Sequence, residues 1–211
     1  MGARPTIGAL LGAQRLIPVL EAPDIEAAIG AVRALVRGGL PVVEIVLRTG
    51  AALEAVRAVR RAVPDAVVGV GTVRTAHELR TAIEVGARFV VSPGTTTALY
   101  RAADELAVPF LPGAATPTEV LEAAARGFET VKIFPAAQLG GPSYIAALSA
   151  VTKPTRFVPT GGISAVDAVD YLACASVLAV GGSFVCPPAL VAARDWPAIS
   201  ARAAEAMQWS R

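Results

Sequence analysis

The sequence predicts an α/β protein, a single-domain (β/α)8 barrel of the TIM type that occupies residues 1–211. Eight short apolar runs alternate with longer segments that have the spacing of amphipathic helices. The runs are continuously apolar, as in parallel strands that are covered on both faces. Eight β-then-α units of about 25 residues fit a minimal barrel. A doubly wound open sheet is the alternative arrangement.

The expected strands are the apolar runs, taken in chain order. They are Leu16–Leu20, Val42–Leu47, Ala66–Val70, Phe89–Val91, Pro109–Leu111, Val131–Phe134, Arg156–Pro159 and Val177–Val180. Helical spacing lies between them in Ile25–Val36, Leu53–Ala62, Ala76–Val85 and Glu119–Ala125. Gly38-Gly39, Gly86 and Gly127 fall where helices should stop, because glycine adopts the positive φ of a helix end.

Composition excludes several classes of protein. Apolar residues make up 54% of the chain, which excludes a disordered chain. The net charge of +2 does not indicate a nucleic-acid-binding protein.

The longest uncharged run, Tyr171 to Ala193, has the length of a membrane span. It contains Gly181-Gly182 and Pro187-Pro188, so we interpret it as a helix end, a short strand, a glycine turn and a helix start. We therefore expect no membrane segment.

Cysteine and histidine are rare in this chain. Two cysteines, Cys174 and Cys186, and one histidine, His77, cannot form a Cys/His zinc site. We expect no metal and no cofactor, and a cytoplasmic location is the default for such cysteine usage. His77 lies in a helical segment, and we expect it on the surface.

Unusual residues follow the predicted strands rather than precede them. Glycine, proline, serine and threonine gather in these turns, which begin at Leu47, Gly69, Ser92, Leu111, Phe134, Pro159 and Gly181. A barrel binds its ligand at the carboxyl ends of its strands, so this asymmetry predicts a site on that face.

Lys132 is one of two lysines and lies inside the apolar run Val131-Lys132-Ile133-Phe134. Side chains alternate along a strand, and the more apolar face meets the helices, so Lys132 points into the barrel. An unpaired buried charge is costly. One interpretation is a buried lysine that is held by a carboxylate. The functional interpretation is an amine that attacks a carbonyl group.

Glu44 is the single acid in another apolar run, Pro41 to Leu47. The same alternation places Glu44 on the inner face, with Val43 and Ile45 facing the helices. A glutamate and a lysine aimed into one small interior suggest a general base and a nucleophile. The alternative is a buried ion pair without a chemical role.

Other turn residues could bind anionic groups. Arg48, one residue beyond its strand, could clamp a carboxylate or stand exposed at the rim. The turns Gly161-Gly162 and Gly181-Gly182-Ser183 precede segments that look helical, which predicts a phosphate site made by backbone N–H groups. Tight turns that need glycine for positive φ are the alternative. Gly69-Val70-Gly71-Thr72 does not continue into a dinucleotide-binding pattern.

Taken together, six motifs resemble the 2-keto-3-deoxy-6-phosphogluconate (KDPG) and 4-hydroxy-2-oxoglutarate (KHG) aldolases over roughly Gly8 to Ala206. The motifs are Val43 to Thr49, Val68 to Val73, Val91 to Gly94, Lys132 to Ala136, Pro159 to Ile163 and Gly181 to Phe184. Members of this family are class I aldolases with a small (β/α)8 barrel. One departure is Ala137, where many relatives have a glutamate.

The resemblance implies a role for each matching position. Lys132 matches the lysine that forms the Schiff base with pyruvate, and Glu44 matches the glutamate that moves protons. The other matching positions are expected to contact substrate. Arg48 and Thr72 match groups that hold the pyruvyl carboxylate, and Thr160 matches a position that influences stereochemistry. The phosphate-binding region is matched by Gly161, Gly162 and Ser183. Two further substrate contacts, Pro93 and Gly182, lie in the matching motifs.

The resemblance also implies a substrate and partners. The expected reaction cleaves 2-dehydro-3-deoxy-6-phosphogluconate to pyruvate and glyceraldehyde 3-phosphate, and the expected assembly is a homotrimer. A 6-phosphogalactonate-type acid or 4-hydroxy-2-oxoglutarate is the alternative substrate. Two other hypotheses stay open. They are a non-catalytic barrel that binds a phosphorylated ligand or serves in an assembly, and a pyridoxal-phosphate protein that uses Lys132.

Overall fold

The computed structural model describes residues 6–210, and residues 1–5 and 211 of the predicted domain lie outside them. The strands are β1 Leu16–Leu20, β2 Val42–Val46, β3 Val67–Gly71, β4 Phe89–Val91, β5 Phe110–Leu111, β6 Gly113–Ala114, β7 Thr130–Ile133, β8 Arg156–Pro159 and β9 Val180–Gly182. The helices are α1 Ile7–Leu11, α2 Ile25–Arg37, α3 Ala52–Ala62, α4 Ala76–Glu84, α5 Thr97–Leu106, α6 Pro117–Ala125, α7 Gly141–Val151, α8 Ala165–Ala173, α9 Pro188–Ala192 and α10 Trp196–Met207, followed by a short 3-10 helix, Gln208–Ser210.

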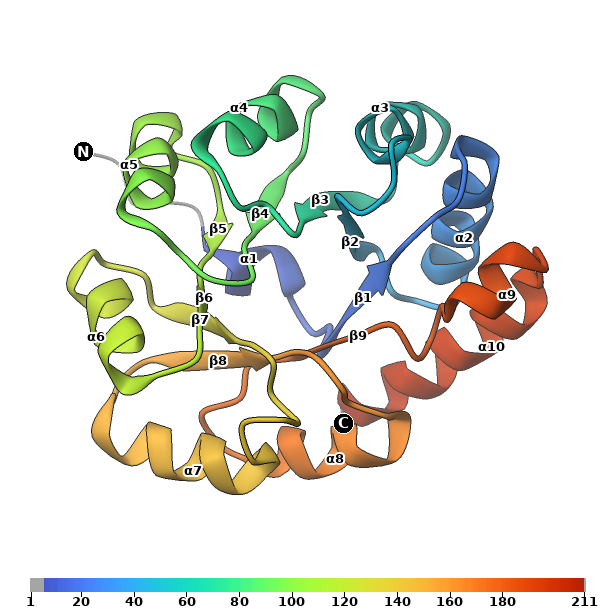
Figure 1. Ribbon diagram of the computed structural model, residues 1–211. Coiled ribbons are helices and arrows are strands. Elements are labelled where there is room, and N and C mark those ends of the chain that lie inside the picture. The colour runs from blue at the N-terminus through green and yellow to red at the C-terminus, as the bar shows by residue number, and fades with distance from the viewer. Residues whose placement is uncertain (1–5, 211) are drawn as a thin grey trace.

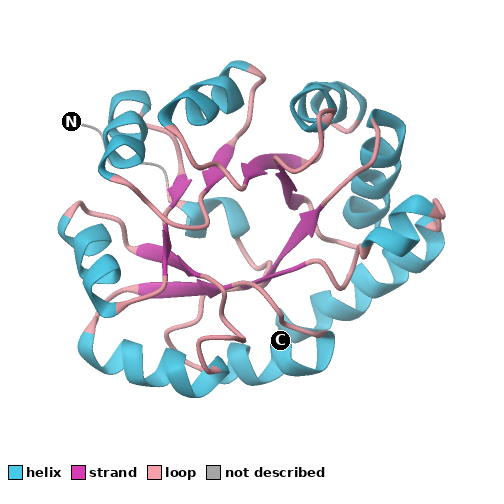
Figure 2. Ribbon diagram, in the orientation of Figure 1, coloured by secondary structure: helices cyan, strands magenta, loops and turns pink. Residues whose placement is uncertain are grey.

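The strands curl around a common interior, and helices α2 to α10 lie outside them (Figure 1). One sheet has the order β5-β4-β3-β2-β1-β9 and the other the order β6-β7-β8, and every strand pair is parallel. Two isolated bridges, Phe157 with Val177 and Thr160 with Gly181, connect the two sheets at β8 and β9. Figure 2 shows the strands inside and the helices around them. The predicted α/β fold with parallel strands is confirmed.

The fifth predicted strand, Pro109–Leu111, differs from the observed structure. The chain forms two short strands there, β5 and β6, which are separated by Pro112. Proline has no backbone N–H to donate, so it interrupts the strand. Gly113, which we expected in a turn, instead pairs with Lys132 of β7.

The last predicted strand also needs correction. The prediction was Val177–Val180 followed by a glycine turn, but β9 is Val180–Gly182, so Gly181 and Gly182 lie in the strand. Both glycines serve close packing rather than positive φ. A Cβ on Gly181 would collide with the Thr160 hydroxyl, and one on Gly182 would collide with the Phe184 ring.

Three helices begin with a capping box directly after the turns that follow strands. Thr75 with Glu78, Thr116 with Glu119 and Ser164 with Asp167 satisfy the first backbone N–H groups of α4, α6 and α8. Because these caps fix where each helix starts, they also fix the turns at the carboxyl ends of β3, β6 and β8.

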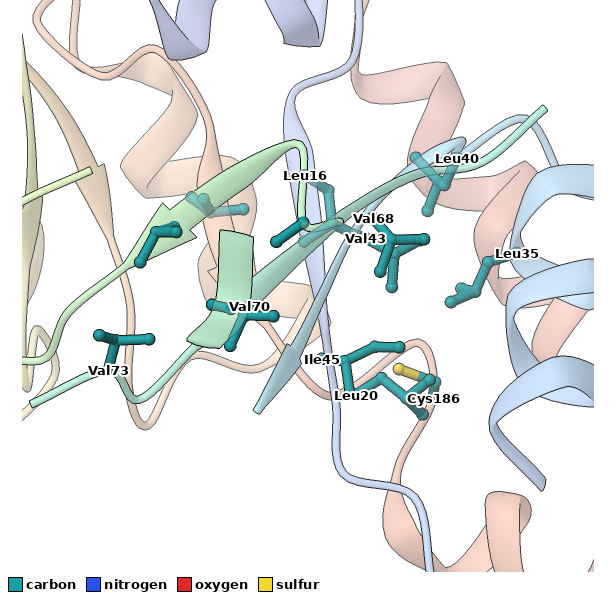
Figure 3. Packing of buried hydrophobic residues seen from close by; sticks show 14 of the residues in the cluster. Leu16, Leu20, Leu35, Leu40, Val43, Ile45, Val68, Val70, Val73 and Cys186 are labelled. Carbon is teal, nitrogen blue, oxygen red and sulfur yellow. The ribbon is translucent and has the colours of Figure 1, made fainter. Parts of the chain in front are cut away.

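Apolar side chains form two layers. The larger cluster lies between strands and helices and includes Val43, Ile45, Val68 and Val70 (Figure 3). The smaller cluster fills the interior on the side of α1. Its members are Ile7, Leu11, Ile17, Val42, Phe89, Val91, Leu111, Val158 and Ala179. Helix α1 contributes Ile7 and Leu11, so it packs at that end of the interior.

This layering confirms the predicted alternation along β2. Val43 and Ile45 belong to the outer cluster and Val42 to the inner one. Val131 and Ile133 of β7 also belong to the outer cluster, which leaves Lys132 on the inner face. No helix among residues 6–210 is long and apolar enough to cross a membrane.

We expect Phe89→Ala to lower the free energy of unfolding by about 3–5 kcal/mol, because it leaves a cavity in the inner cluster. Phe89 is fully buried, and its ring occupies the space beside Gly69. Urea denaturation followed by circular dichroism measures the change. Val151→Ala is the control, since Val151 is 64% exposed, and it should change stability by less than about 0.5 kcal/mol. A loss below about 1 kcal/mol for Phe89→Ala would contradict the assigned packing.

Candidate active site

A cavity of about 500 Å³ opens at the carboxyl ends of the strands. Its volume is in the range of small-molecule sites. It brings together every residue that the sequence analysis assigned to chemistry or substrate binding. These are Glu44, Arg48, Thr72, Pro93, Lys132, Thr160, Gly161, Gly162, Gly182 and Ser183. The inner apolar cluster lies beneath this cavity, so the two ends of the interior differ in character.

Lys132 and Glu44 form a buried ion pair on the cavity wall. The Lys132 Nζ donates to Glu44 Oε1 at 3.4 Å, and the two side chains are 6% and 2% exposed. They project from β7 and β2, and the two residues are 88 positions apart in the chain. The Phe134 ring centroid lies 5.6 Å from Nζ and gives the ammonium group a second favourable contact. A nucleophile and a proton acceptor thus face one small space.

Gly71 makes room for the Glu44 side chain. A Cβ built on Gly71 would collide with Glu44 Oε1 and with the carboxyl carbon behind it. In the β2–β3 pairing Glu44 is the partner of Gly69 and Gly71 is the partner of Val46, so the Glu44 side chain reaches along the neighbouring strand to Gly71. The sequence showed this glycine only as part of a turn, and its steric role became visible once Glu44 was placed.

Thr72 has a strained backbone. Its φ is +60°, in the left-handed region that β-branched residues rarely adopt. It directly follows β3 and lines the cavity. Such strain persists where surrounding structure enforces it, and it concentrates at functional sites. The conformation turns the chain at the end of β3, where Thr72 lines the same cavity as Glu44 and Arg48.

Arg48 lies at the cavity rim, and its partner was not predicted. Its Nη1 is 3.5 Å from Glu21 Oε2, and the two side chains are 51% and 42% exposed. Arg48 is therefore exposed at the rim and also lines the cavity, and its role as a carboxylate clamp stays a prediction. Glu21 follows the apolar run of β1, and nothing in its local sequence indicated a partner at the end of the adjacent strand β2.

The two glycine segments proposed for phosphate differ from each other. Gly161 and Gly162 have φ of +99° and +72° and precede α8, as predicted. Ser183 does not directly precede a helix, because α9 begins only at Pro188 and has five residues. That expectation was wrong. The chain turns between Phe184 and Cys186 before the prolines allow a helix to start.

Gln138 and Cys186 also line the cavity, although the sequence analysis did not select them. A Cβ on Gly162 would lie 3.1 Å from the Gln138 side-chain nitrogen, which places this amide at the glycine turn.

Burial raises the pKa of Cys186 to about 12, so its thiol stays protonated at neutral pH. Figure 3 shows Cys186 beside Leu20 and Ile45, in apolar surroundings. His77 is exposed on α4, as expected.

The family model for KDPG and KHG aldolases matches residues 7–202 of this chain. The chain belongs to this family. The KHG/KDPG aldolase of Escherichia coli K12 is 39% identical over 196 residues, which cover 93% of this chain and 92% of that protein. The predicted resemblance is confirmed, and the protein is an aldolase, a carbon–carbon lyase.

Two solved structures of aldolases are similar to this one. The KDPG aldolase of Zymomonas mobilis with 3-phosphoglycerate has a TM-score of 0.93 at 40% identity, with 98% of this chain and 97% of that chain covered. The KDPG aldolase of Legionella pneumophila has a TM-score of 0.92 at 34% identity, with 96% and 98% covered. In the Legionella structure, pyruvate was captured at low pH as a covalent carbinolamine intermediate.

We expect Gly71→Ala to reduce aldolase activity at least about tenfold while the protein stays folded. The added methyl group would push Glu44 away from Lys132, and small displacements of catalytic groups are costly. Steady-state cleavage rates and circular dichroism measure the two effects. Gly50→Ala is the matched control, because nothing lies within 4 Å of a Cβ there. Activity of Gly71→Ala equal to that of the control would show that this glycine does not position Glu44.

Proposed function

We propose that this aldolase cleaves 2-dehydro-3-deoxy-6-phosphogluconate to pyruvate and glyceraldehyde 3-phosphate through a Schiff base on Lys132. The observation that carries the proposal is the buried Lys132 amine, which faces the cavity with Glu44 at 3.4 Å. The carbinolamine in the similar Legionella enzyme supports this chemistry, since a carbinolamine precedes an imine.

The first stage joins enzyme and substrate. The unprotonated Lys132 amine attacks the C2 ketone and forms a carbinolamine, which loses water to give a protonated imine. Glu44 lies within reach of Nζ and can accept and return the protons of these steps. Apolar surroundings beneath the cavity keep bulk water away from the pair.

The second stage breaks the carbon–carbon bond. Glu44, directly or through a water, takes the proton of the C4 hydroxyl group, and the C4 oxygen becomes the carbonyl of the aldehyde product. The electron pair of the C3–C4 bond moves toward the iminium nitrogen and leaves an enamine on Lys132. C3 of the enamine then takes up a proton, and water hydrolyses the imine to release pyruvate. The iminium is the electron sink, so these steps require no metal or cofactor.

The remaining cavity residues fit the rest of the substrate. Arg48 offers a guanidinium group for the 2-keto carboxylate, and Thr72, which lines the same cavity, offers a hydroxyl group. Pro93 completes that wall of the cavity. The Thr160 hydroxyl is held by the Val158 carbonyl at 3.3 Å, in a position to influence how the aldehyde is oriented.

The opposite end of the cavity suits the substrate phosphate. Backbone N–H groups of the turn before α8 are suited to an anion. The expected contacts are Gly161, Gly162, Gly182 and Ser183.

4-Hydroxy-2-oxoglutarate is a second candidate substrate. The family model covers both reactions, and the Escherichia coli relative is named for both. Among residues 6–210, the charged side chains that line the cavity are two cations and two carboxylates, Arg48 and Lys132 with Glu21 and Glu44. This balance does not require a phosphate.

We also propose that the two sheets act as one closed barrel of eight strand positions. The bridges between β8 and β9 support this, as does the direct succession of β5 and β6 across Pro112. A homotrimer is a prediction from the family resemblance, and a cytoplasmic location is a prediction from the cysteine usage. Sedimentation analysis would test the first.

We expect pyruvate with borohydride to place one reduced adduct on Lys132. The chain has two lysines, and Lys153 lies exposed in a loop, so peptide mapping by mass spectrometry distinguishes them. Lys132→Ala should form no adduct. Labelling of Lys153 alone, or of neither lysine, would refute the proposed mechanism.

We expect Glu44→Gln to keep imine formation but to slow turnover about 100-fold or more, the effect of losing a general base. Glutamine keeps the size of the side chain but cannot accept the proton. Borohydride trapping measures the imine, and the rate of pyruvate release measures turnover. Near-normal turnover would mean that Glu44 is only a structural partner of Lys132.

A further inference from the structure

Glu21 is a carboxylate at the mouth of the cavity with no place in the mechanism above. It lies directly after β1, lines the cavity, and pairs with Arg48 at 3.5 Å. The pair is about half exposed, so each partner also faces the solvent through which substrate arrives. An exposed pair of this kind contributes little to stability. Its position suggests an effect on substrate binding instead.

Strand order places Glu21 between the two anion-binding ends of the cavity. β1 pairs with β2 on one side and with β9 on the other, and Pro18 is the partner of Gly182. Glu21 therefore emerges on the rim between Arg48, which follows β2, and Ser183, which follows β9. A substrate that bridges these ends must pass beside its carboxylate.

In the part of the chain that the structure describes, the cavity lining has no excess of positive charge to offset a second anionic group. Each cation of its described lining already has a carboxylate partner, Lys132 with Glu44 and Arg48 with Glu21. The end near the glycine turn offers neutral groups, the Gln138 amide and the Ser183 hydroxyl among them. Arg48 offsets the charge of Glu21 on the β2 side, but no cation of the described lining offsets it on the side of the glycine turn, where a phosphate would lie.

We propose that Glu21 is a specificity-determining residue that weakens the preference for a phosphorylated substrate over 4-hydroxy-2-oxoglutarate. This inference rests on the proposed function. Both substrates have a 2-keto carboxylate, so repulsion at that end is the same for both. They differ at the far end, where a phosphate has close to two negative charges and a carboxylate has one. The repulsion from Glu21 is therefore larger for the phosphate.

The test is Glu21→Gln, which keeps size and removes the charge. The ratio of kcat/KM for 2-dehydro-3-deoxy-6-phosphogluconate to kcat/KM for 4-hydroxy-2-oxoglutarate should rise about threefold, the size of a screened charge–charge interaction. The change should appear in KM, with kcat within about twofold, because Glu21 does not act on the reacting bond. Glu21→Asp keeps the charge and should keep the wild-type ratio.

Glu105→Gln is the matched control. Glu105 is also a surface carboxylate paired with an arginine, Arg80 at 2.7 Å, but it lies on α5 and does not line the cavity. It should leave the ratio unchanged. An unchanged or lower ratio for Glu21→Gln, or an equal shift for Glu21→Asp, would overturn the inference. Failure of wild-type enzyme to form the pyruvate adduct on Lys132 would instead overturn the proposed function.

Discussion

A lysine and a glutamate form a buried ion pair between an apolar cluster and an open cavity, and most of the local structure serves to keep them there. Removing such a pair from water costs several kcal/mol per ion, roughly, and their attraction offsets this only when the geometry is good. Gly71 supplies the space for Glu44, and Phe134 covers Lys132 from the other side. The strands that bear the pair must therefore keep both their register and their neighbours.

One end of the interior contributes to stability, and the other end holds the groups for chemistry. On the side of α1, side chains such as Phe89 and Val158 fill the space, and α1 itself adds Ile7 and Leu11. Near the carboxyl ends, the interior is left open and polar, and Thr72 is held in a strained conformation. Proteins tolerate such strain where the rest of the fold is well packed. Capping boxes after β3 and β8 keep these turns in place.

Sequence reasoning succeeded where a local rule determines the outcome. Alternation along a strand placed Lys132 and Glu44 on the inner face, and the structure pairs them. It failed where the outcome depends on distant contacts. The division of the fifth strand follows from the missing N–H of Pro112, and the strand position of Gly181 follows from the Thr160 side chain that approaches it. Neither neighbour can be identified from spacing alone.

Glu21 shows the same limit at the site. Its contact with Arg48 arises because the ends of two adjacent strands bring together residues that are 27 positions apart. The family motifs include Arg48 but not Glu21, so the resemblance gave no signal either.

This cavity contains two ion pairs, Lys132 with Glu44 and Arg48 with Glu21. Because the pairs differ in burial, their charge interactions differ in strength and in what they can do. The Lys132 and Glu44 side chains are 6% and 2% exposed. In such buried surroundings low polarity strengthens every charge interaction. A proton that moves from one partner to the other then changes the chemistry that the pair can perform. The Arg48–Glu21 side chains are 51% and 42% exposed, where water and salt screen the interaction. A screened pair cannot drive bond cleavage. It can shift the relative affinity of substrates that differ by one charge, because discrimination requires only a small difference in free energy. Depth in the cavity thus separates the groups that perform the reaction from those that select what enters it.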